Sequence, residues 1–424
     1  MNGFTIVFLV ALALGVVIQI WLGLRQARAV RENRDRVPSP FAPKIPLPDH
    51  QKAADYTLAR LSVEYWQLLL FPLVTLAWTL GGGLEWLAQT MANLSAPPLW
   101  SGALIVLSVF FINGVIELPL QLWSTFGIEQ RFGFNRTTPG RFARDKLLGI
   151  ALLLMLGAPL LLAVLWLMES AGEYWWLAVW CLWMGFSLLM TWVFPTWIAP
   201  LFNRFEPLKE GPLKSRLEAL LARCGFQTRG MYVMDGSTRS SHGNAYFTGF
   251  GRNKRIVFYD TLLDGLEEAE VEAVLAHELG HFRRHHVIKL LALSALFSFA
   301  GLALLGWLID QAWFYTGLGL STRSLAAGLT LFLLVAPVFT VFSTPLLSML
   351  SRRYEFEADA FAARHASAQA LVDGLLGMYR DNASTLTPDR LYSAFHHSHP
   401  AATERIAHLL GEETVVADTI HSPS

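Results

Sequence analysis

The chain has 424 residues, of which 53% are hydrophobic and only 16% are charged, and its formal net charge is zero. Soluble domains carry about 25% charged residues, so this chain lacks the polar surface that a water-soluble protein needs. The neutral balance argues against a protein that binds nucleic acid through phosphate contacts. With two cysteines, Cys181 in an apolar stretch and Cys224 in a polar one, a disulfide framework is not expected and a cysteine-rich zinc module is excluded. Any metal ion must therefore be held by histidine and carboxylate side chains.

Apolar stretches of about 20 residues, the length that crosses a bilayer as a helix, occur seven times along the chain. The first has no basic segment before it and no small-residue cleavage site after it, so we expect a retained span rather than a signal peptide. The predicted spans are residues 4–24, 65–87, 100–123, 147–168, 175–201, 287–309 and 325–350. The sequence thus predicts a multi-pass integral membrane protein whose partner is the lipid bilayer.

Basic residues are unevenly distributed over the loops between these spans. The loops after the first and third spans are rich in Lys and Arg, whereas residues 88–99 and 169–174 contain neither. The positive-inside rule then places the N-terminus outside and the C-terminus in the cytoplasm. Two polar regions, 202–286 and 351–424, consequently face the cytoplasm. The short loops and the final residues HSPS, which carry no dilysine signal, favour a bacterial inner membrane, with the endoplasmic reticulum as the eukaryotic equivalent.

The third span contains two polar residues that a simple anchor would not need, Asn113 and Glu117. Carboxylates inside a membrane usually face a bundle interior or a watery cavity. Two interpretations remain open for Glu117: a water-filled interior, or a hydrogen bond between helices. Glu85, late in the second predicted span, is expected to lie near the membrane interface.

The segment VEAVLAHELGHFRRHH (residues 271–286) contains the candidate catalytic and metal-binding residues. An acidic first turn and apolar residues at helical spacing predict a helix here. His277 and His281 are four residues apart, so their imidazoles share one helix face and can bind one metal ion. Glu278 lies beside them and can accept a proton from an activated water molecule. This HExxH pattern predicts a zinc peptidase helix at the cytoplasmic boundary of the membrane.

A catalytic zinc ion needs a third protein ligand. Directly after the last span, SRRYEFEADAFAARH (residues 351–365) places Glu355 and Asp359 on one helix face, with Glu357 rotated by about 200°. One member of the pair can bind zinc, and the other can accept a hydrogen bond from a ligand histidine. The alternative is an ordinary amphipathic helix at the membrane surface.

Two further histidines, His285 and His286, follow the HExxH motif. On a continuous helix His285 lies about 12 Å from His277 along the axis, too far for both to bind one ion. We therefore expect His285 and His286 to mark the membrane interface together with Arg283 and Arg284.

Several blocks together resemble the type I CAAX prenyl protease family of integral-membrane zinc metalloproteases. The blocks are HELGH (277–281), SRRYEFEADAFA (351–362), HSHPAATERI (397–406), GNAYFTGFGRNKRIVFYDTLL (243–263) and FGIEQRFGFNRTTPGRFARDKL (126–147). The resemblance covers essentially the whole chain. It implies a mainly α fold: a barrel of seven transmembrane helices encloses a water-filled chamber and is capped by a cytoplasmic zincin-like domain with a small β-sheet. The implied parts are residues 1–201 with five spans, 202–286 with the HExxH helix, 287–350 with two spans, and 351–424, which completes the zinc site.

The resemblance also implies the roles of individual residues. One Zn²⁺ ion would be held by His277, His281 and Glu355, with Glu278 as general base and Asp359 behind the ligands. His399 and Arg405 would bind substrate or stabilise the oxyanion. Asn244 and Ala245 would pair with the substrate backbone, and RIVFYDTLL (255–263) independently predicts a strand beside them, so that a peptide could add to the sheet edge.

Three functions are compatible with these observations. The first is an endopeptidase that removes a C-terminal tripeptide from a prenylated CAAX protein. The second is a quality-control protease that acts on membrane proteins without a prenyl requirement. The third, a channel, transporter or scaffold with a structural zinc ion, is disfavoured because such sites usually have four protein ligands, whereas HExxH supplies a base instead. In the proteolytic functions the partner is a peptide or protein substrate, lipidated in the first case, and no nucleic acid is expected.

Overall fold

The computed structural model describes residues 2–39, 41–93, 96–249 and 254–411. Among them, seven helical segments are long and apolar enough to cross a membrane. These are Gly3–Glu32, Leu47–Trp78, Pro98–Phe132, Pro139–Ser170, Gly172–Phe202, His286–Leu308 and Leu325–His365. The predicted number and order of the spans are therefore confirmed.

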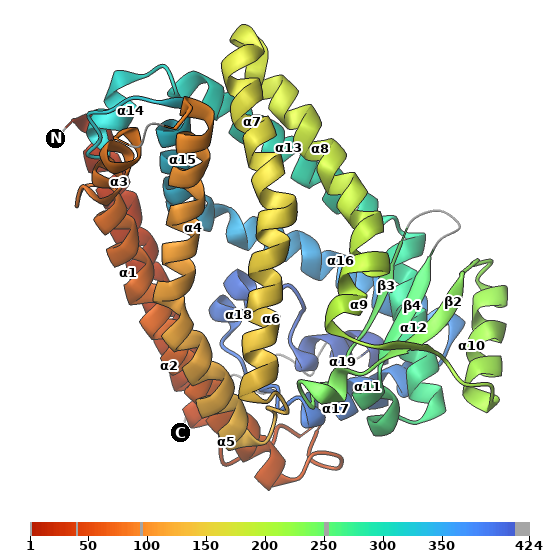
Figure 1. Ribbon diagram of the computed structural model, residues 1–424. Helices are drawn as coiled ribbons and strands as arrows, with labels where there is room; N and C mark the ends of the chain where they lie inside the picture. The colour runs from red at the N-terminus through yellow and green to blue at the C-terminus, as the bar shows by residue number, and fades with distance from the viewer. Residues whose placement is uncertain (1, 40, 94–95, 250–253, 412–424) are drawn as a thin grey trace.

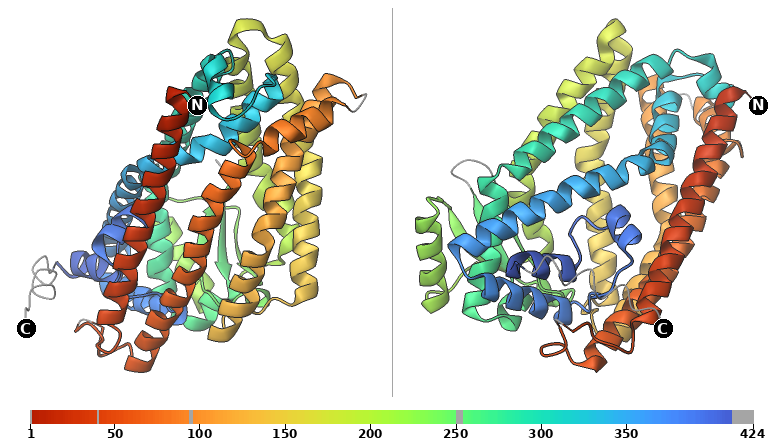
Figure 2. Two further views of the ribbon diagram at one scale, coloured as in Figure 1. Left: turned by 90° about the vertical axis from the view of Figure 1, so that its left-hand side faces the viewer. Right: turned by 180° about the vertical axis from the view of Figure 1, so that it is seen from behind.

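The spans form a closed ring in which each one contacts the next along the chain. The ring consists of α1 (Gly3–Glu32), α2 (Leu47–Trp78), α4 (Pro98–Leu122), α7 (Ala158–Ser170), α8 (Trp175–Val193), α13 (His286–Leu308) and α15 (Leu325–Thr340). Contacts between α15 and α1 close it into a barrel (Figures 1 and 2). Large apolar side chains such as Trp66, Trp166 and Trp307 remain exposed, as expected for a surface that contacts lipid.

The second predicted span is wrong at its C-terminal end. Helix α2 ends at Trp78, and a separate helix, α3 (Gly83–Ala92), begins after a turn. Gly82 in this turn has a φ of 77°, a left-handed conformation that glycine adopts without steric cost. The carboxylate of Glu85 in α3 accepts hydrogen bonds from Ser321 and Thr322, which follow α14 (Ala312–Gly317). Glu85 thus joins α3 to the segment that follows α14.

Three spans contain π-helical turns close to a proline. The turns are η1 (Trp123–Glu129), η2 (Leu153–Gly157) and η4 (Phe194–Ile198), and the nearby prolines are Pro119, Pro159 and Pro195. Proline cannot donate the regular backbone hydrogen bond, so the helix accommodates it by a local change of pitch. The shorter helices that continue these spans are α5 (Gln130–Phe132), α6 (Pro139–Leu152), α9 (Ala199–Phe202) and the 3₁₀ turn η3 (Gly172–Tyr174).

The last predicted span also has a different end. Helix α15 stops at Thr340, a 3₁₀ turn η6 (Val341–Ser343) follows, and α16 (Thr344–His365) begins at a new angle. The apolar residues 344–350 therefore belong to the helix that carries Glu355 and Asp359. One rigid element thus connects the barrel to the polar cap (Figure 2).

The cap contains a small sheet of four strands. The strands are β1 (Phe205–Pro207), β2 (Gly230–Met234), β3 (Ala245–Thr248) and β4 (Arg255–Tyr259), in the order β1-β2-β4-β3. Strands β2 and β4 run parallel, while β1 and β3 pair antiparallel with their neighbours. The predicted strand at 255–263 ends at Tyr259, because Asp260 begins helix α11 (Asp260–Gly265).

Helices pack around this sheet to form the core of the cap. They are α10 (Pro212–Arg223), α12 (Glu268–Arg283), α16, α17 (Ala368–Asp381) and the shorter elements η5 (Gly236–Thr238), α18 (Arg390–His396) and α19 (Ala402–Leu410). Leu217, Phe258, Leu275 and Leu279 are almost fully buried in this core. Figure 1 shows the cap at one end of the barrel, with α18 and α19 on the inner side of the ring.

The polar residues of the third span have different environments. Asn113 accepts a hydrogen bond of 2.8 Å from the indole N–H of Trp78, which joins α4 to α2. Glu117 is exposed, and no described residue forms a hydrogen bond with it. Two interpretations were left open for Glu117. Within the described ranges the structure shows no hydrogen bond between helices at this residue.

Candidate metal centre

Helix α12 presents the HExxH residues towards α16. Its N-terminus is fixed by a capping box between Glu267 and Glu270, and its apolar face is buried in the cap core. A Cβ atom on Gly280 would lie only 2.9 Å from the Cα of Ala358, so glycine allows the two helices to approach closely here. This close packing places Glu355 opposite His277 and His281.

Three side chains from these two helices converge on one point. The ligating atoms of His277, His281 and Glu355 all lie within 4.8 Å of one another. The two Nε2 atoms are 3.2 Å apart, and the carboxylate oxygens of Glu355 lie 3.5 Å and 3.3 Å from Nε2 of His277 and His281. Two ligands bound tetrahedrally at 2.0–2.1 Å would be separated by about 3.3 Å, so the spacing suits a single metal ion.

The tautomers of the two histidines support the same conclusion. His277 Nδ1 donates to the carboxylate of Asp359, which leaves the Nε2 atom as an acceptor. His281 Nδ1 faces His286, so its Nε2 atom is an acceptor as well. Two nitrogen lone pairs facing each other repel unless a cation lies between them. One oxygen of Glu355, Oε2, is buried without a hydrogen-bond donor among the described residues, and a metal ion would satisfy all three atoms.

The surroundings of His277 form what we call the deep side of the site: His277, Asp359 and Arg405. Asp359 is fully buried and accepts hydrogen bonds from His277 at 2.8 Å and from Arg405 at 2.9 Å and 2.6 Å. Burial opposes a positive charge on His277, but its hydrogen bonds to Asp359 and Glu355 outweigh this and raise its pKa to about 9. Without a metal ion the second proton of His277 would lie on Nε2, so the deep side favours a cation at this atom, and a bound metal ion would take the place of that proton.

The structure places Arg405 against Asp359 and Glu355. Its side chain is buried, and its guanidinium holds the carboxylate of Asp359 with two nitrogens, while a third lies 3.7 Å from Glu355. A bidentate pair of this kind fixes the acceptor of His277. Arg405 thus holds Asp359 behind the ligands, and its expected contact with the substrate or the oxyanion stays a prediction.

The surroundings of His281 form the boundary side of the site: His281, His286 and Glu357. His281 Nδ1 lies 3.0 Å from Nδ1 of His286, whose Nε2 lies 3.2 Å from the carboxylate of Glu357. His286 must donate to the carboxylate, so its Nδ1 accepts from His281. The ring of His286 also stacks on Tyr354, with 4.1 Å between the centroids.

This placement corrects the expectation that His286 marks the membrane interface. The chain is not one continuous helix: α12 ends at Arg283, and His285 has a left-handed φ of 57° before α13 begins at His286. The break turns His286 back towards His281 and buries it. Helical periodicity could not indicate this, because a positive φ at a histidine has no strong sequence signal. Glu357, which the helical pattern also set aside, proves to be the partner of His286.

Glu278 and His399 complete the immediate surroundings of the cluster. Glu278 is half-buried on α12, where burial raises its pKa and the charges of the neighbouring histidines partly oppose the rise. His399, which follows α18, places Nδ1 2.7 Å from Glu355 Oε2, although not in hydrogen-bonding geometry, and 63% of its side chain is exposed. Both side chains therefore lie where a substrate bound at the cluster would contact them.

Asn244 and Ala245 lie at the start of β3, which is the edge strand of the sheet. The carbonyl of Asn244 accepts the backbone N–H of Tyr259, and its exposed side chain accepts that of Ala245. In the described residues, β3 pairs with β4 alone, so its other edge has no strand partner there.

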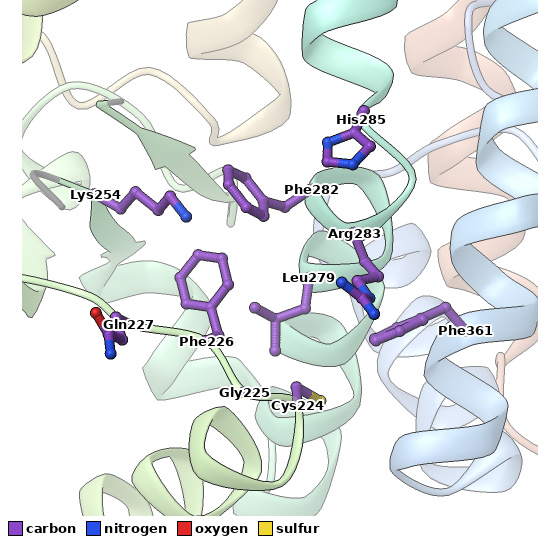
Figure 3. A pocket seen from close by; sticks show the side chains of 10 residues that line it. All are labelled: Cys224, Gly225, Phe226, Gln227, Lys254, Leu279, Phe282, Arg283, His285 and Phe361. Carbon is purple, nitrogen blue, oxygen red and sulfur yellow. The ribbon is translucent and has the colours of Figure 1, made fainter. Parts of the chain in front are cut away.

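A separate cavity of about 230 Å³ lies between the C-terminal part of α12 and the loop after α10, and it is lined by Phe226, Lys254 and Phe282, among others (Figure 3). The ammonium group of Lys254 lies 3.7 Å from the ring centroid of Phe282 and 4.6 Å from that of Phe226. None of the three clustered side chains lines this cavity. It is therefore not part of the candidate metal centre.

Known protein families match both the membrane-spanning N-terminal part of the chain and the part that follows it. Residues 26–204 match the family model of the CAAX prenyl protease N-terminal region with five membrane helices, and residues 207–413 match peptidase family M48. The CAAX prenyl protease 1 homolog of Oryza sativa subsp. japonica is 33% identical over 93% of this chain and 94% of its own. That of Arabidopsis thaliana is 38% identical over 73% and 74%. The crystal structure of S. mikatae Ste24p is similar with a TM-score of 0.90 and 26% identity, and the match covers 96% of this chain and 99% of that chain.

Proposed function

The chain belongs to the CAAX prenyl protease family of M48 metallopeptidases, and from this premise we propose that it is a zinc endopeptidase that hydrolyses peptide bonds near the C-terminus of CAAX-type substrates. As a family member it is a multi-pass integral membrane protease that acts on peptides or proteins. The observation that carries the proposal is the convergence of His277, His281 and Glu355 within 4.8 Å, with Glu278 beside them.

We assign one zinc ion to this cluster. Two imidazoles and one carboxylate are a donor set typical of catalytic zinc, in which the fourth position stays open for water or substrate. The chemistry that zinc supplies at such a site is Lewis acidity towards the scissile carbonyl and activation of water. Asp359 and His286 orient the two imidazoles so that both Nε2 atoms face the ion.

Glu278 serves as the general base. It accepts the proton of the attacking water and returns it to the leaving amine. Its raised pKa suits both steps, since a base that is too weak cannot take the proton and an acid that is too strong cannot hold it until the amine leaves.

His399 and the edge of β3 orient the substrate. From its exposed position beside Glu355, His399 donates a hydrogen bond to the oxyanion that develops on the scissile carbonyl. The backbone of the peptide pairs with β3 at Asn244 and Ala245, as an added strand. Arg405 acts indirectly, by holding Asp359.

We further propose that the cap faces the cytoplasm, with the N-terminus outside, because the basic loops contact the cap, as the pairs Lys44–Asp373 and Arg239–Asp145 show. We also propose the bacterial inner membrane as its location, because the loops between the spans are short. The barrel encloses water, and the exposed Glu117 supports this because carboxylates within a membrane usually face a bundle interior or a watery cavity. Residues 1–201 and 287–350 then form the barrel, while 202–286 and 351–424 form the cap.

The test is proteolysis of a farnesylated CAAX peptide and of its unprenylated twin by the full-length protein in detergent. Glu278→Gln serves as the control: it should lower kcat by more than about 100-fold while the protein keeps its zinc, measured by elemental analysis. Cleavage of the farnesylated peptide alone, lost in the variant, supports CAAX specificity. Cleavage of both peptides at similar rates would assign the protein to broad quality-control proteolysis without a prenyl requirement. Cleavage of neither by a zinc-loaded protein would refute the proposal.

A further inference from the structure

A cavity of about 480 Å³ opens directly beside the candidate metal centre. It lies between α2, the end of α17 and the segment after α18, and its lining includes Arg60, Tyr379, His397 and His399. Its volume is within the range of about 300–1,000 Å³ that is typical of ligand sites. His399 belongs both to this cavity and to the surroundings of Glu355. A molecule in the cavity would therefore lie next to the reacting bond.

Arg60 gives this cavity a permanent positive charge. It is the one Lys or Arg among the described residues that line the cavity, and its side chain is exposed. Its guanidinium carbon lies 5.8 Å from the ring centroid of Tyr56, one turn earlier on α2. Burial lowers the pKa of His397 to about 4 and also lowers that of His396, so these neighbours are neutral at pH 7.

The carboxylates near Arg60 are engaged by other groups. Glu64, which also lines the cavity, accepts a hydrogen bond of 2.9 Å from the hydroxyl of Tyr392. Glu129 accepts one from Tyr56 at 2.5 Å and lies 3.4 Å from Nε2 of His242. Within the described part of the chain, no carboxylate forms an ion pair with Arg60. An anionic ligand can therefore approach its guanidinium.

The edge strand indicates which part of a peptide would reach this cavity. His242, two residues before Asn244, lines the cavity. Its ring stacks on Phe134, and its Nδ1 lies 3.2 Å from the side-chain oxygen of Asn382, so its position is fixed. A peptide that pairs antiparallel with β3 runs in the opposite direction to the chain, from Thr248 past Asn244 towards His242. Its carboxyl-terminal part is the part that enters the cavity.

We propose that this cavity holds the carboxyl-terminal segment of the substrate and that Arg60 binds its terminal α-carboxylate. The inference rests on the proposed function and refines it. A guanidinium–carboxylate pair is a strong, charge-assisted interaction. Because Arg60 lines the same cavity as His399, which lies beside Glu355, the pair would fix the number of residues between the chain end and the bond that is cut. Arg60 is then a specificity-determining residue that sets the length of the fragment released by cleavage.

The experiment compares two peptides that differ only at the C-terminus, one with a free carboxylate and one with a carboxamide. The full-length protein should cleave the carboxylate with a kcat/KM about 10- to 100-fold higher, the range of a charge-assisted hydrogen bond. Arg60→Gln should bring this ratio close to one by slowing cleavage of the carboxylate peptide alone. Arg60→Lys, which keeps the charge, should retain most of the ratio. Arg390→Gln, at an exposed arginine on α18 outside the cavity, should leave it unchanged.

The amide peptide serves as an internal control for folding, because its cleavage does not depend on the proposed contact. The inference is overturned if the wild type cleaves both peptides equally, or if Arg60→Gln keeps the wild-type ratio. A parallel loss of both activities in Arg60→Gln also overturns it, since the residue would then support the fold without recognising the carboxylate. Failure of the wild type to cleave either peptide would instead refute the proposed function.

Discussion

The two sides of the metal centre orient their histidines by different means. On the deep side, His277 donates to Asp359, a fully buried carboxylate that Arg405 holds with two nitrogens. On the boundary side, His281 donates to His286, a neutral partner that passes the interaction on to Glu357, whose side chain is 28% exposed. Both arrangements fix the same tautomer, with Nε2 facing the cluster. The first uses buried charge, and the second uses a histidine at the junction of the cap and the barrel.

The difference follows from where each histidine lies along the chain. His277 is buried in the cap, where α16 and α19 supply the ion pair of Asp359 and Arg405. His281 is one turn from the end of α12, where the chain turns towards the membrane at His285. A fully buried charge there would have to be desolvated next to lipid, which is costly. We therefore expect loss of the deep side to affect folding and metal binding together, and loss of the boundary side to affect mainly metal binding.

The largest effect is expected from Asp359→Ala. This change leaves Arg405 buried without a counter-charge and His277 without its acceptor, and breaking such a buried pair costs about 3–5 kcal/mol. The midpoint of thermal unfolding in detergent should fall strongly, with or without zinc. Asp373→Ala is a control, because Asp373 pairs with Lys44 at the surface and its loss should cost less than about 1 kcal/mol. Equal destabilisation by the two variants would contradict the proposed importance of the deep side.

A smaller and more selective effect is expected from His286→Phe. Phenylalanine can still stack on Tyr354, but it cannot accept the hydrogen bond from His281. Zinc affinity should fall by about 10- to 100-fold, measured by competition with a chelator, while the unfolding midpoint of the metal-free protein changes little. Excess zinc should restore most of the activity.

Glu357→Gln gives a graded comparison for the boundary side. The amide oxygen of glutamine can still accept from His286, so the loss of zinc affinity should be smaller than with His286→Phe. If neither substitution changed zinc affinity, the boundary side would have no part in orienting His281.

The smallest effect is expected at His285, where the chain turns between the two regions. A valine at a φ of 57° adds steric strain of about 1–2 kcal/mol, because its branched Cβ clashes with the backbone, whereas glycine adopts this conformation freely. His285→Val should lower both the unfolding midpoint and zinc affinity slightly, and His285→Gly should leave zinc affinity close to that of the wild type. Identical zinc affinities of the two variants would show that the turn does not position His286.

Much of the fold could be predicted from the sequence, but the ends of its elements could not. Seven long apolar segments are a strong local signal, and the spans were found in the right order. Errors arose where packing overrides composition. The apolar pattern continues across the turn at Gly82, and residues 344–350 are apolar although they belong to the helix that carries Glu355.

At the candidate metal centre, the sequence allowed us to predict those residues that lie on regular helices. His277 and His281, and likewise Glu355 and Asp359, share helix faces because of their four-residue spacing, and the structure brings both pairs together. The sequence did not determine which carboxylate contacts which nitrogen of each histidine. His286 was assigned to the membrane interface and Arg60 was not singled out, because nothing in their neighbouring residues indicates a long-range partner.

The sequence by itself thus determined that the protein spans a membrane seven times and that two helices carry a histidine pair and a carboxylate pair. These properties depend on local periodicity and on the length of apolar segments, which neighbouring residues encode. Only the tertiary structure decided that Arg405 lies behind Asp359, that His286 turns back to His281, and that Arg60 faces the cavity beside His399. Those contacts depend on a turn with a positive φ and on the closure of a ring of helices, and both are set by packing between residues far apart in the chain.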